Sequence, residues 1–62
     1  DYSYEAFTRY YGGTPPNVLR DYAENELDVK RRVMFKRLAE ELESGIIYIP
    51  REDGSLSYQK VV

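Results

Sequence analysis

The spacing of hydrophobic residues changes character along this 62-residue chain. In the first three segments they recur every three or four positions, the pattern of helices that each bury one face. After Gly45 the pattern becomes a β-forming run from Ile46 to Pro50, followed by alternation from Leu56 onward. This order predicts three helices and a β-hairpin in one α+β domain spanning residues 1–62.

The first helix is predicted over residues 3–11. Ser3 is a suitable N-cap, and Gly12-Gly13 is a typical terminator. An aromatic stripe at helical spacing predicts the buried face, and it consists of Tyr4, Phe7, Tyr10 and Tyr11. We interpret this stripe as core rather than as a platform for stacking a ligand.

The second helix is predicted over residues 15–24. Thr14 is a good N-cap, and Pro15 suits the first helical position, where its missing N–H has no partner to lose. The apolar face is expected to hold Val18, Leu19, Tyr22 and Ala23. In the connection, Asn25 and Asp28 tolerate a left-handed backbone, and Asp28 can also cap the next helix.

The third helix is predicted over residues 29–44, ended by Gly45. At about 100° per residue, one side of it collects the expected core positions Met34, Phe35, Leu38 and Leu42. The predicted hairpin covers residues 46–62, with Asp53-Gly54 as its turn and Pro50 ending its first strand. The acidic residues Glu40, Glu41 and Glu43 are expected to be solvated.

Positive charge is concentrated in the third helix. Five of the nine basic residues lie between Lys30 and Arg37 without an acid among them, although the whole chain carries a net charge of -2. Positive charge near a helix N-terminus opposes the helix dipole, so this arrangement favours a functional interpretation over a purely stabilising one. It marks one face as a docking site for an anion, such as a nucleic-acid backbone.

The stretch from Val18 to Val29, the basic run that follows it, Leu38 and residues 43–47 resemble the winged helix-turn-helix superfamily. Leu27-Asp28-Val29 resembles the turn before a recognition helix, with Asp28 at the position where glycine is preferred. Gly45-Ile46-Ile47 resembles the exit from that helix into a wing strand. The resemblance implies a third helix that enters the major groove and a hairpin wing beside it.

Several side chains are expected to contact DNA. Arginine and lysine neutralise phosphates and hydrogen-bond guanine, and an exposed valine can contact a thymine methyl group. The candidates are Lys30, Arg32, Val33, Lys36 and Arg37 on the third helix and Arg51 at the hairpin tip. Arg31 lies nearer the core side and is expected to pair with an acid.

We therefore expect a domain that binds double-stranded DNA, as a transcriptional regulator or as a module of a larger protein. An isoelectric point of about 5.0 weakens long-range attraction to DNA. A winged-helix protein–protein interaction module, with a protein partner or as a homodimer, is the alternative. A helical oligomerisation domain is a third class.

The sequence has neither histidine nor cysteine. Its serines therefore have no imidazole to activate them, and neither a zinc–thiolate site nor a glycine-rich phosphate loop is present. We expect no enzyme, cofactor, metal or small-molecule substrate. No apolar run approaches the roughly 20 residues of a membrane span. We expect no membrane partner, and the lack of cysteine fits an intracellular location, in cytoplasm, nucleoid or nucleus.

Overall fold

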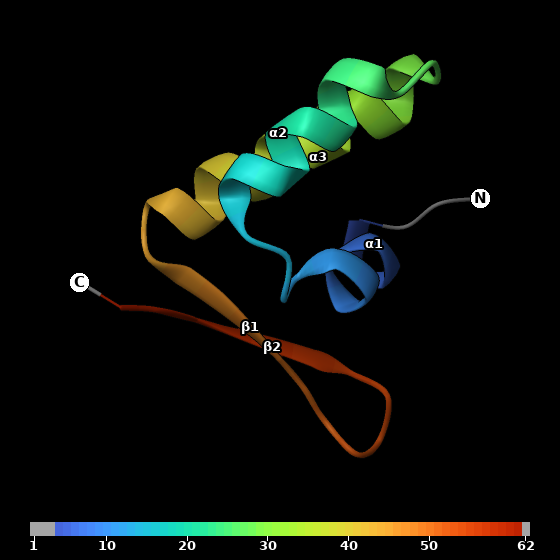
Figure 1. Ribbon diagram of the computed structural model, residues 1–62. Coiled ribbons are helices and arrows are strands. Elements are labelled where there is room, and N and C mark those ends of the chain that lie inside the picture. Colours follow the sequence, from blue (N-terminus) through green and yellow to red (C-terminus); the bar gives the residue numbers. More distant parts are fainter. Residues whose placement is uncertain (1–3, 62) are drawn as a thin grey trace.

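The computed structural model describes residues 4–61, and it confirms the expected α+β order of three helices and a hairpin. The elements are α1 (Tyr4–Tyr11), α2 (Pro16–Asn25), α3 (Val29–Glu43), β1 (Ile46–Pro50) and β2 (Leu56–Lys60). Figure 1 shows α2 and α3 together as the upper part of the molecule, the hairpin as the lower part and α1 between them. The Cα atoms span 32 × 30 × 13 Å, so the domain is flat and encloses few residues.

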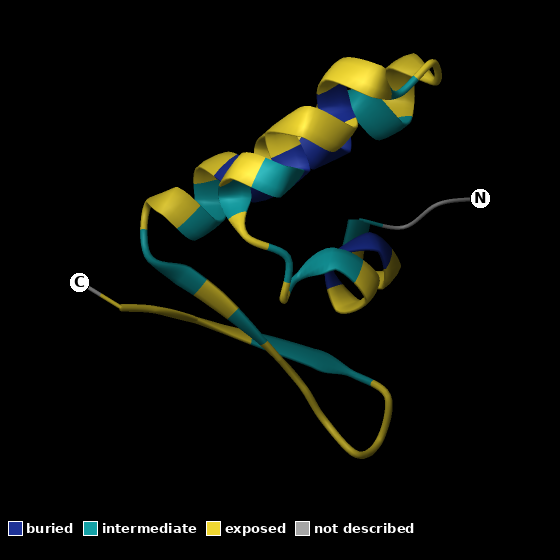
Figure 2. Cartoon of the chain, viewed as in Figure 1, coloured by how far each residue is buried: buried dark blue, intermediate teal, exposed yellow. Residues whose placement is uncertain are grey.

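Among residues 4–61, seven hydrophobic side chains form the core, on the facing sides of the helices in Figure 2. They are Phe7 from α1, Leu19 and Ala23 from α2, and Met34, Phe35, Leu38 and Ala39 from α3. The predicted core side of α3 is thus confirmed for Met34, Phe35 and Leu38, while Leu42 is partly buried. On α2, Tyr22 remains 45% exposed, which corrects its expected core position.

The aromatic stripe of α1 is buried only in part. Phe7 is buried, and Tyr4 and Tyr11 pack against the core, but Tyr10 is 77% exposed, so its predicted burial is wrong. Thr8 is buried instead, with its hydroxyl donating to the Glu5 carbonyl at 2.9 Å. The buried side of the helix is centred near Tyr4 and Tyr11, which turns position 10 toward solvent. The proposed capping role of Ser3 lies outside the described residues.

The start of α2 lies one residue later than predicted. Pro15 is the N-cap with φ −59° and ψ 145°, Pro16 is the first helical residue, and Thr14 makes no side-chain cap. The reason is Pro16 itself, because a proline disfavours helical geometry at the residue before it. The connection to α3 was also predicted wrongly: within residues 4–61 no residue other than glycine has a positive φ. The capping role of Asp28 is confirmed by its 3.0 Å bond from the Lys30 N–H.

The hairpin leaves α3 through Gly45, as predicted. Its φ of +96° is accessible to glycine, and the Val61 N–H donates to its carbonyl at 2.6 Å. The strands pair antiparallel with Tyr48 opposite Tyr58. At the tip, the Arg51 N–H donates to the Ser55 carbonyl at 2.9 Å, and Arg9 of α1 donates to the Gly54 carbonyl. The hairpin tip is therefore fastened to α1.

Candidate nucleic-acid interface

The solvent side of α3 carries three of the predicted DNA contacts. Lys30, Val33 and Lys36 are all exposed, and Val33 is 58% exposed although it is apolar. Burial of Leu38 and Ala39 on the opposite side of the helix fixes this orientation. Neither lysine side chain forms a hydrogen bond or ion pair with any residue in the described range 4–61. Their ammonium groups are therefore available to an external anion.

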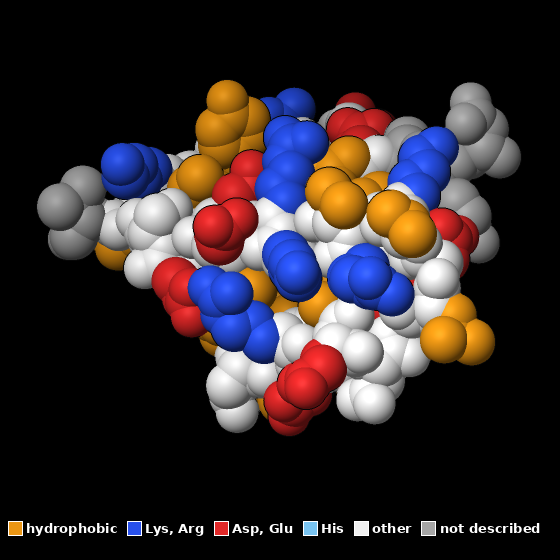
Figure 3. All heavy atoms as spheres, turned by 90° about the horizontal axis from the view of Figure 1, so that it is seen from above, with side chains coloured by type: hydrophobic (Ala, Val, Ile, Leu, Met, Phe, Trp, Pro, Cys, Tyr) orange, Lys and Arg blue, Asp and Glu red, His pale blue; other side chains and the backbone are white. Residues whose placement is uncertain are grey.

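Seen from above, lysine and arginine side chains gather across the face formed by α2 and α3 (Figure 3). Hydrophobic side chains lie among them, and acidic side chains surround them in the same view. A shallow hollow of about 470 Å³ lies on these two helices, lined by Arg20, Ala23, Glu24, Arg32 and Lys36. The positive charge of α3 is thus extended by a basic residue of α2 that sequence reasoning missed.

Arg20 itself pairs with Glu43 across the two helices. The pair holds the pKa of the Glu43 carboxyl below its ordinary value, chiefly through the hydrogen bond from Arg20. Glu43 is exposed, as expected, and it also joins the C-terminal end of α3 to α2 through this pair. The sequence signal for this contact is that Arg20 is the single basic residue of α2.

Arg32 does not point freely to solvent, contrary to prediction. Its Nε and one terminal nitrogen donate to the Glu26 carbonyl at 3.2 and 3.0 Å. Glu26 is the C-cap of α2, where helix carbonyls lack intrahelical partners and the dipole favours a positive charge. Arg32 therefore fastens the start of α3 to the end of α2. Its role is structural in the free protein.

Arg37 is exposed, but its guanidinium contacts two other side chains of the chain. Its guanidinium carbon lies 3.9 Å from the centre of the Tyr4 ring, and its Nε lies 3.5 Å from a carboxylate oxygen of Glu41. The side chain remains 60% exposed, so the ion pair is of the weak surface kind. Arg37 can still present positive charge at the edge of α3 nearest α1.

Arg31 pairs with an acid, as predicted. Its Nε donates to Glu26 at 2.9 Å, and a terminal nitrogen donates to the Tyr11 hydroxyl at 3.1 Å. The hydrogen bond to Glu26 is the main reason that the pKa of the Arg31 guanidinium lies above its ordinary value. The same bond lowers the pKa of the Glu26 carboxyl. Arg31 is therefore charged, and its charge is balanced within the chain.

Arg51 is exposed at the hairpin tip, but it does not lie beside the first turn of α3. In Figure 1 the tip and the N-terminal end of α3 are at opposite sides of the molecule, with α1 between them. The bond from Arg9 to Gly54 keeps the tip against α1. The hairpin tip thus lies on the α1 side of the domain, and the DNA contact expected of Arg51 stays a prediction.

Two further observations concern metal ions and membranes. Among residues 4–61, no group of three or more acidic side chains is arranged to hold a metal ion. In the same range, no helix combines the length and the apolar character needed to cross a membrane.

Comparison with models of known protein families, with the curated proteins and with the solved structures gives no match for this chain. The resemblance to winged helices therefore stays a prediction from the sequence.

Proposed function

We propose that this domain binds double-stranded DNA through the solvent side of α3. The α3 face, as we define it, comprises Lys30, Val33, Lys36 and Arg37. The observation that carries the proposal is the exposure of Lys30 and Lys36 without an acidic partner, on either side of an exposed valine. Lysines in this state can neutralise phosphates without first breaking an ion pair.

The dimensions of the α3 face suit a DNA groove. Lys30 and Arg37 are seven positions apart, or about 10 Å at a rise of about 1.5 Å per residue. A helix of ordinary diameter enters the major groove, where Val33 would meet thymine methyl groups and the flanking cations would meet phosphates or guanines. Arg32 would hold α3 against α2 while these contacts form, because it is bonded to the Glu26 carbonyl.

The basic hollow on α2 and α3 offers a second phosphate position. Arg20 and Lys36 both line it, and Lys36 belongs also to the α3 face. A phosphate bound there would compete with Glu43 for Arg20. In this proposal the domain is a transcriptional regulator or a module of a larger protein, and it acts inside the cell, where DNA is present. With a net charge of -2, binding by the isolated domain should be weak and strongly salt-dependent.

A titration with a mixed-sequence DNA duplex, followed residue by residue by NMR at two salt concentrations, tests the proposal. We expect shift changes concentrated at residues 29–37. Lys36→Ala should weaken binding and reduce the log–log salt slope by about one unit. Lys60→Ala is the matched control, because Lys60 is an exposed lysine on β2 and should change affinity less. Absence of shifts in α3 at low salt would refute DNA binding by this face.

A further inference from the structure

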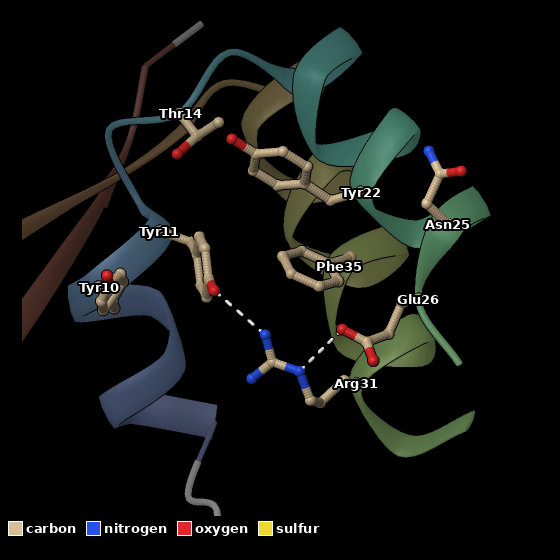
Figure 4. Close-up of a pocket in the computed structure, with 8 residues that line it drawn as sticks. All are labelled: Tyr10, Tyr11, Thr14, Tyr22, Asn25, Glu26, Arg31 and Phe35. Atoms are coloured by element: carbon tan, nitrogen blue, oxygen red, sulfur yellow. Dashed lines mark hydrogen bonds and ion pairs between the residues drawn. The ribbon is translucent and has the colours of Figure 1, made fainter. Parts of the chain in front are cut away.

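An aromatic cavity of about 540 Å³ opens between the C-terminal end of α1 and the α2–α3 pair (Figure 4). It is separate from the α3 face, since it shares none of the four residues that define that face. Eight side chains line it: Tyr10, Tyr11, Thr14, Tyr22, Asn25, Glu26, Arg31 and Phe35. Half of them are aromatic, which is an unusual concentration for the surface of a small domain.

The rings form a continuous wall with an exposed rim. Tyr11 lies 4.9 Å from Phe35 and 6.2 Å from Tyr22 between ring centres, and Tyr10 lies 4.6 Å from Tyr11. Phe35 is buried at the base, whereas Tyr10 and Tyr22 remain largely accessible. An enclosed small-molecule site would bury such rings, so this open arrangement suits an extended segment of polypeptide.

The charges in the cavity select against several ligands. Its two charged side chains, Arg31 and Glu26, are paired at 2.9 Å, so the lining is electrically balanced. The Arg31 guanidinium also lies 5.4 Å from the Phe35 ring and 5.9 Å from the Tyr11 ring. The chain's own cation thus occupies the cation–π positions, which disfavours a quaternary ammonium ligand. Nucleotides would bring phosphates without an unbalanced cation to receive them.

The hydroxyl groups at the rim of the cavity suit a ligand that is rich in hydrogen-bond acceptors. Within the described residues, the hydroxyls of Tyr10, Thr14 and Tyr22 have no hydrogen-bond partner. The Tyr11 hydroxyl accepts from Arg31, which leaves its own proton to donate. The cavity therefore combines ring faces with hydroxyl donors and no net charge. The complementary ligand is uncharged, presents apolar rings and carries unpaired carbonyl groups.

We propose that this cavity binds a proline-rich segment of a partner protein in the polyproline II conformation. Such a segment has no internal hydrogen bonds, so its carbonyls are free to accept from tyrosine hydroxyls. Proline supplies no N–H donor and packs its ring against aromatic side chains, the recognition used by aromatic grooves in general. The pre-extended chain also loses little entropy on binding, which suits a shallow site. This inference is independent of DNA binding by the α3 face.

The test uses an N-acetylated, C-amidated octaproline peptide titrated into the labelled 62-residue protein and followed by NMR. We expect saturable shifts at the residues that line the cavity, and none at residues 29, 30 and 33. Tyr10→Ala should weaken binding at least about five-fold, the loss typical of one aromatic contact. Tyr22→Phe keeps the ring and removes the hydroxyl, so it should weaken binding less. Tyr58→Ala is the matched control, since Tyr58 is 72% exposed on β2 and outside this cavity.

Three outcomes would overturn the proposal. Equal shifts with a glycine–serine peptide of the same length would show non-specific contact. Stronger shifts at the same residues with an eight-nucleotide thymidine oligonucleotide would assign the cavity to single-stranded nucleic acid. Unchanged affinity in Tyr10→Ala, in a variant whose amide spectrum shows the native fold, would place the peptide elsewhere. A duplex titration of Tyr10→Ala separates the two proposals, because this variant should bind DNA like the parent protein.

Discussion

The Tyr48 hydroxyl donates a 2.7 Å hydrogen bond to Oε1 of Glu41, joining β1 to the C-terminal half of α3. The Tyr4 hydroxyl donates to the same oxygen, so one carboxylate connects α1, α3 and β1. Glu41 was expected to be solvated, and it is instead half-buried as the common acceptor. Because two contacts depend on neutral tyrosines, this cluster makes stability sensitive to alkaline pH.

The first prediction concerns that sensitivity. Burial, followed by the hydrogen bond to Glu41, raises the pKa of Tyr48 from 10.0 to about 12. Burial is also the main cause that raises the pKa of Tyr4. A raised pKa in the folded state means that the stabilisation is fully present below pH 10.0 and is lost as pH rises through about 12. Denaturant unfolding across this range should show decreasing stability.

Replacement of Tyr48 by Phe removes one of the two titrating hydroxyls on Glu41, so the decrease between these pH values should become shallower. At neutral pH the same variant should be less stable by roughly 1.5–3 kcal/mol, the value of a hydrogen bond to a charged group. Tyr58→Phe is the control, because Tyr58 lies on the surface of β2. An alkaline profile identical in Tyr48→Phe and the parent would contradict this assignment.

The second prediction concerns Leu38, which is 0% exposed in the middle of the core. Leu38→Ala leaves a cavity and should cost roughly 2–5 kcal/mol. Since a small domain has little more stability than this in total, the variant should be largely unfolded at room temperature. Circular dichroism and thermal melting measure the loss. Leu27→Ala is the matched control, because Leu27 is 90% exposed and should melt like the parent.

The third prediction separates two arginines that hold the same pair of helices. Arg32 donates two hydrogen bonds to the C-cap carbonyl of α2. Arg32→Ala removes both and should destabilise the fold by roughly 1–2 kcal/mol. Arg32→Lys should not restore the stability, because an ammonium group cannot reproduce the planar fork. Arg20 forms an exposed ion pair, so Arg20→Ala should change stability little. Urea unfolding of the three variants checks this order, and equal losses would contradict it.

The predictable parts of this fold are those governed by local chemistry. The core side of α3 follows from the spacing of Met34 and Leu38, and the cap at Asp28 follows from its short polar side chain. Gly45 at the end of α3 and Gly54 in the hairpin turn were predictable, because glycine most readily takes the positive φ that both positions adopt. These features depend on residues close together in sequence.

The residues whose roles were predicted wrongly make contacts with segments that are distant in the sequence. Arg32 finds its acceptor at the end of α2, and Glu41 finds donors on α1 and β1, which no spacing within α3 encodes. Tyr10 was assigned to the core by helical spacing alone, whereas the positions of α3 and β1 decide which side of α1 is covered. The aromatic cavity follows from the same packing. It could not be predicted before α1 and α2 were placed together.

The last prediction contrasts two glycines with similar backbone angles and different surroundings. Gly45 has a φ of +96° and Gly54 a φ of +87°, so alanine at either position takes a left-handed conformation that costs about 1–2 kcal/mol. A Cβ on Gly45 would also lie 2.0 Å from the Val61 carbonyl oxygen, whereas a Cβ on Gly54 meets no atom within 4 Å. The Val61 carbonyl is backbone and cannot move without disturbing the bond from its N–H to Gly45. Gly45→Ala should therefore be clearly less stable than Gly54→Ala in thermal melting, and its amide shifts should change along both strands. Equal melting temperatures for the two variants would show that the end of β2 is not held against Gly45.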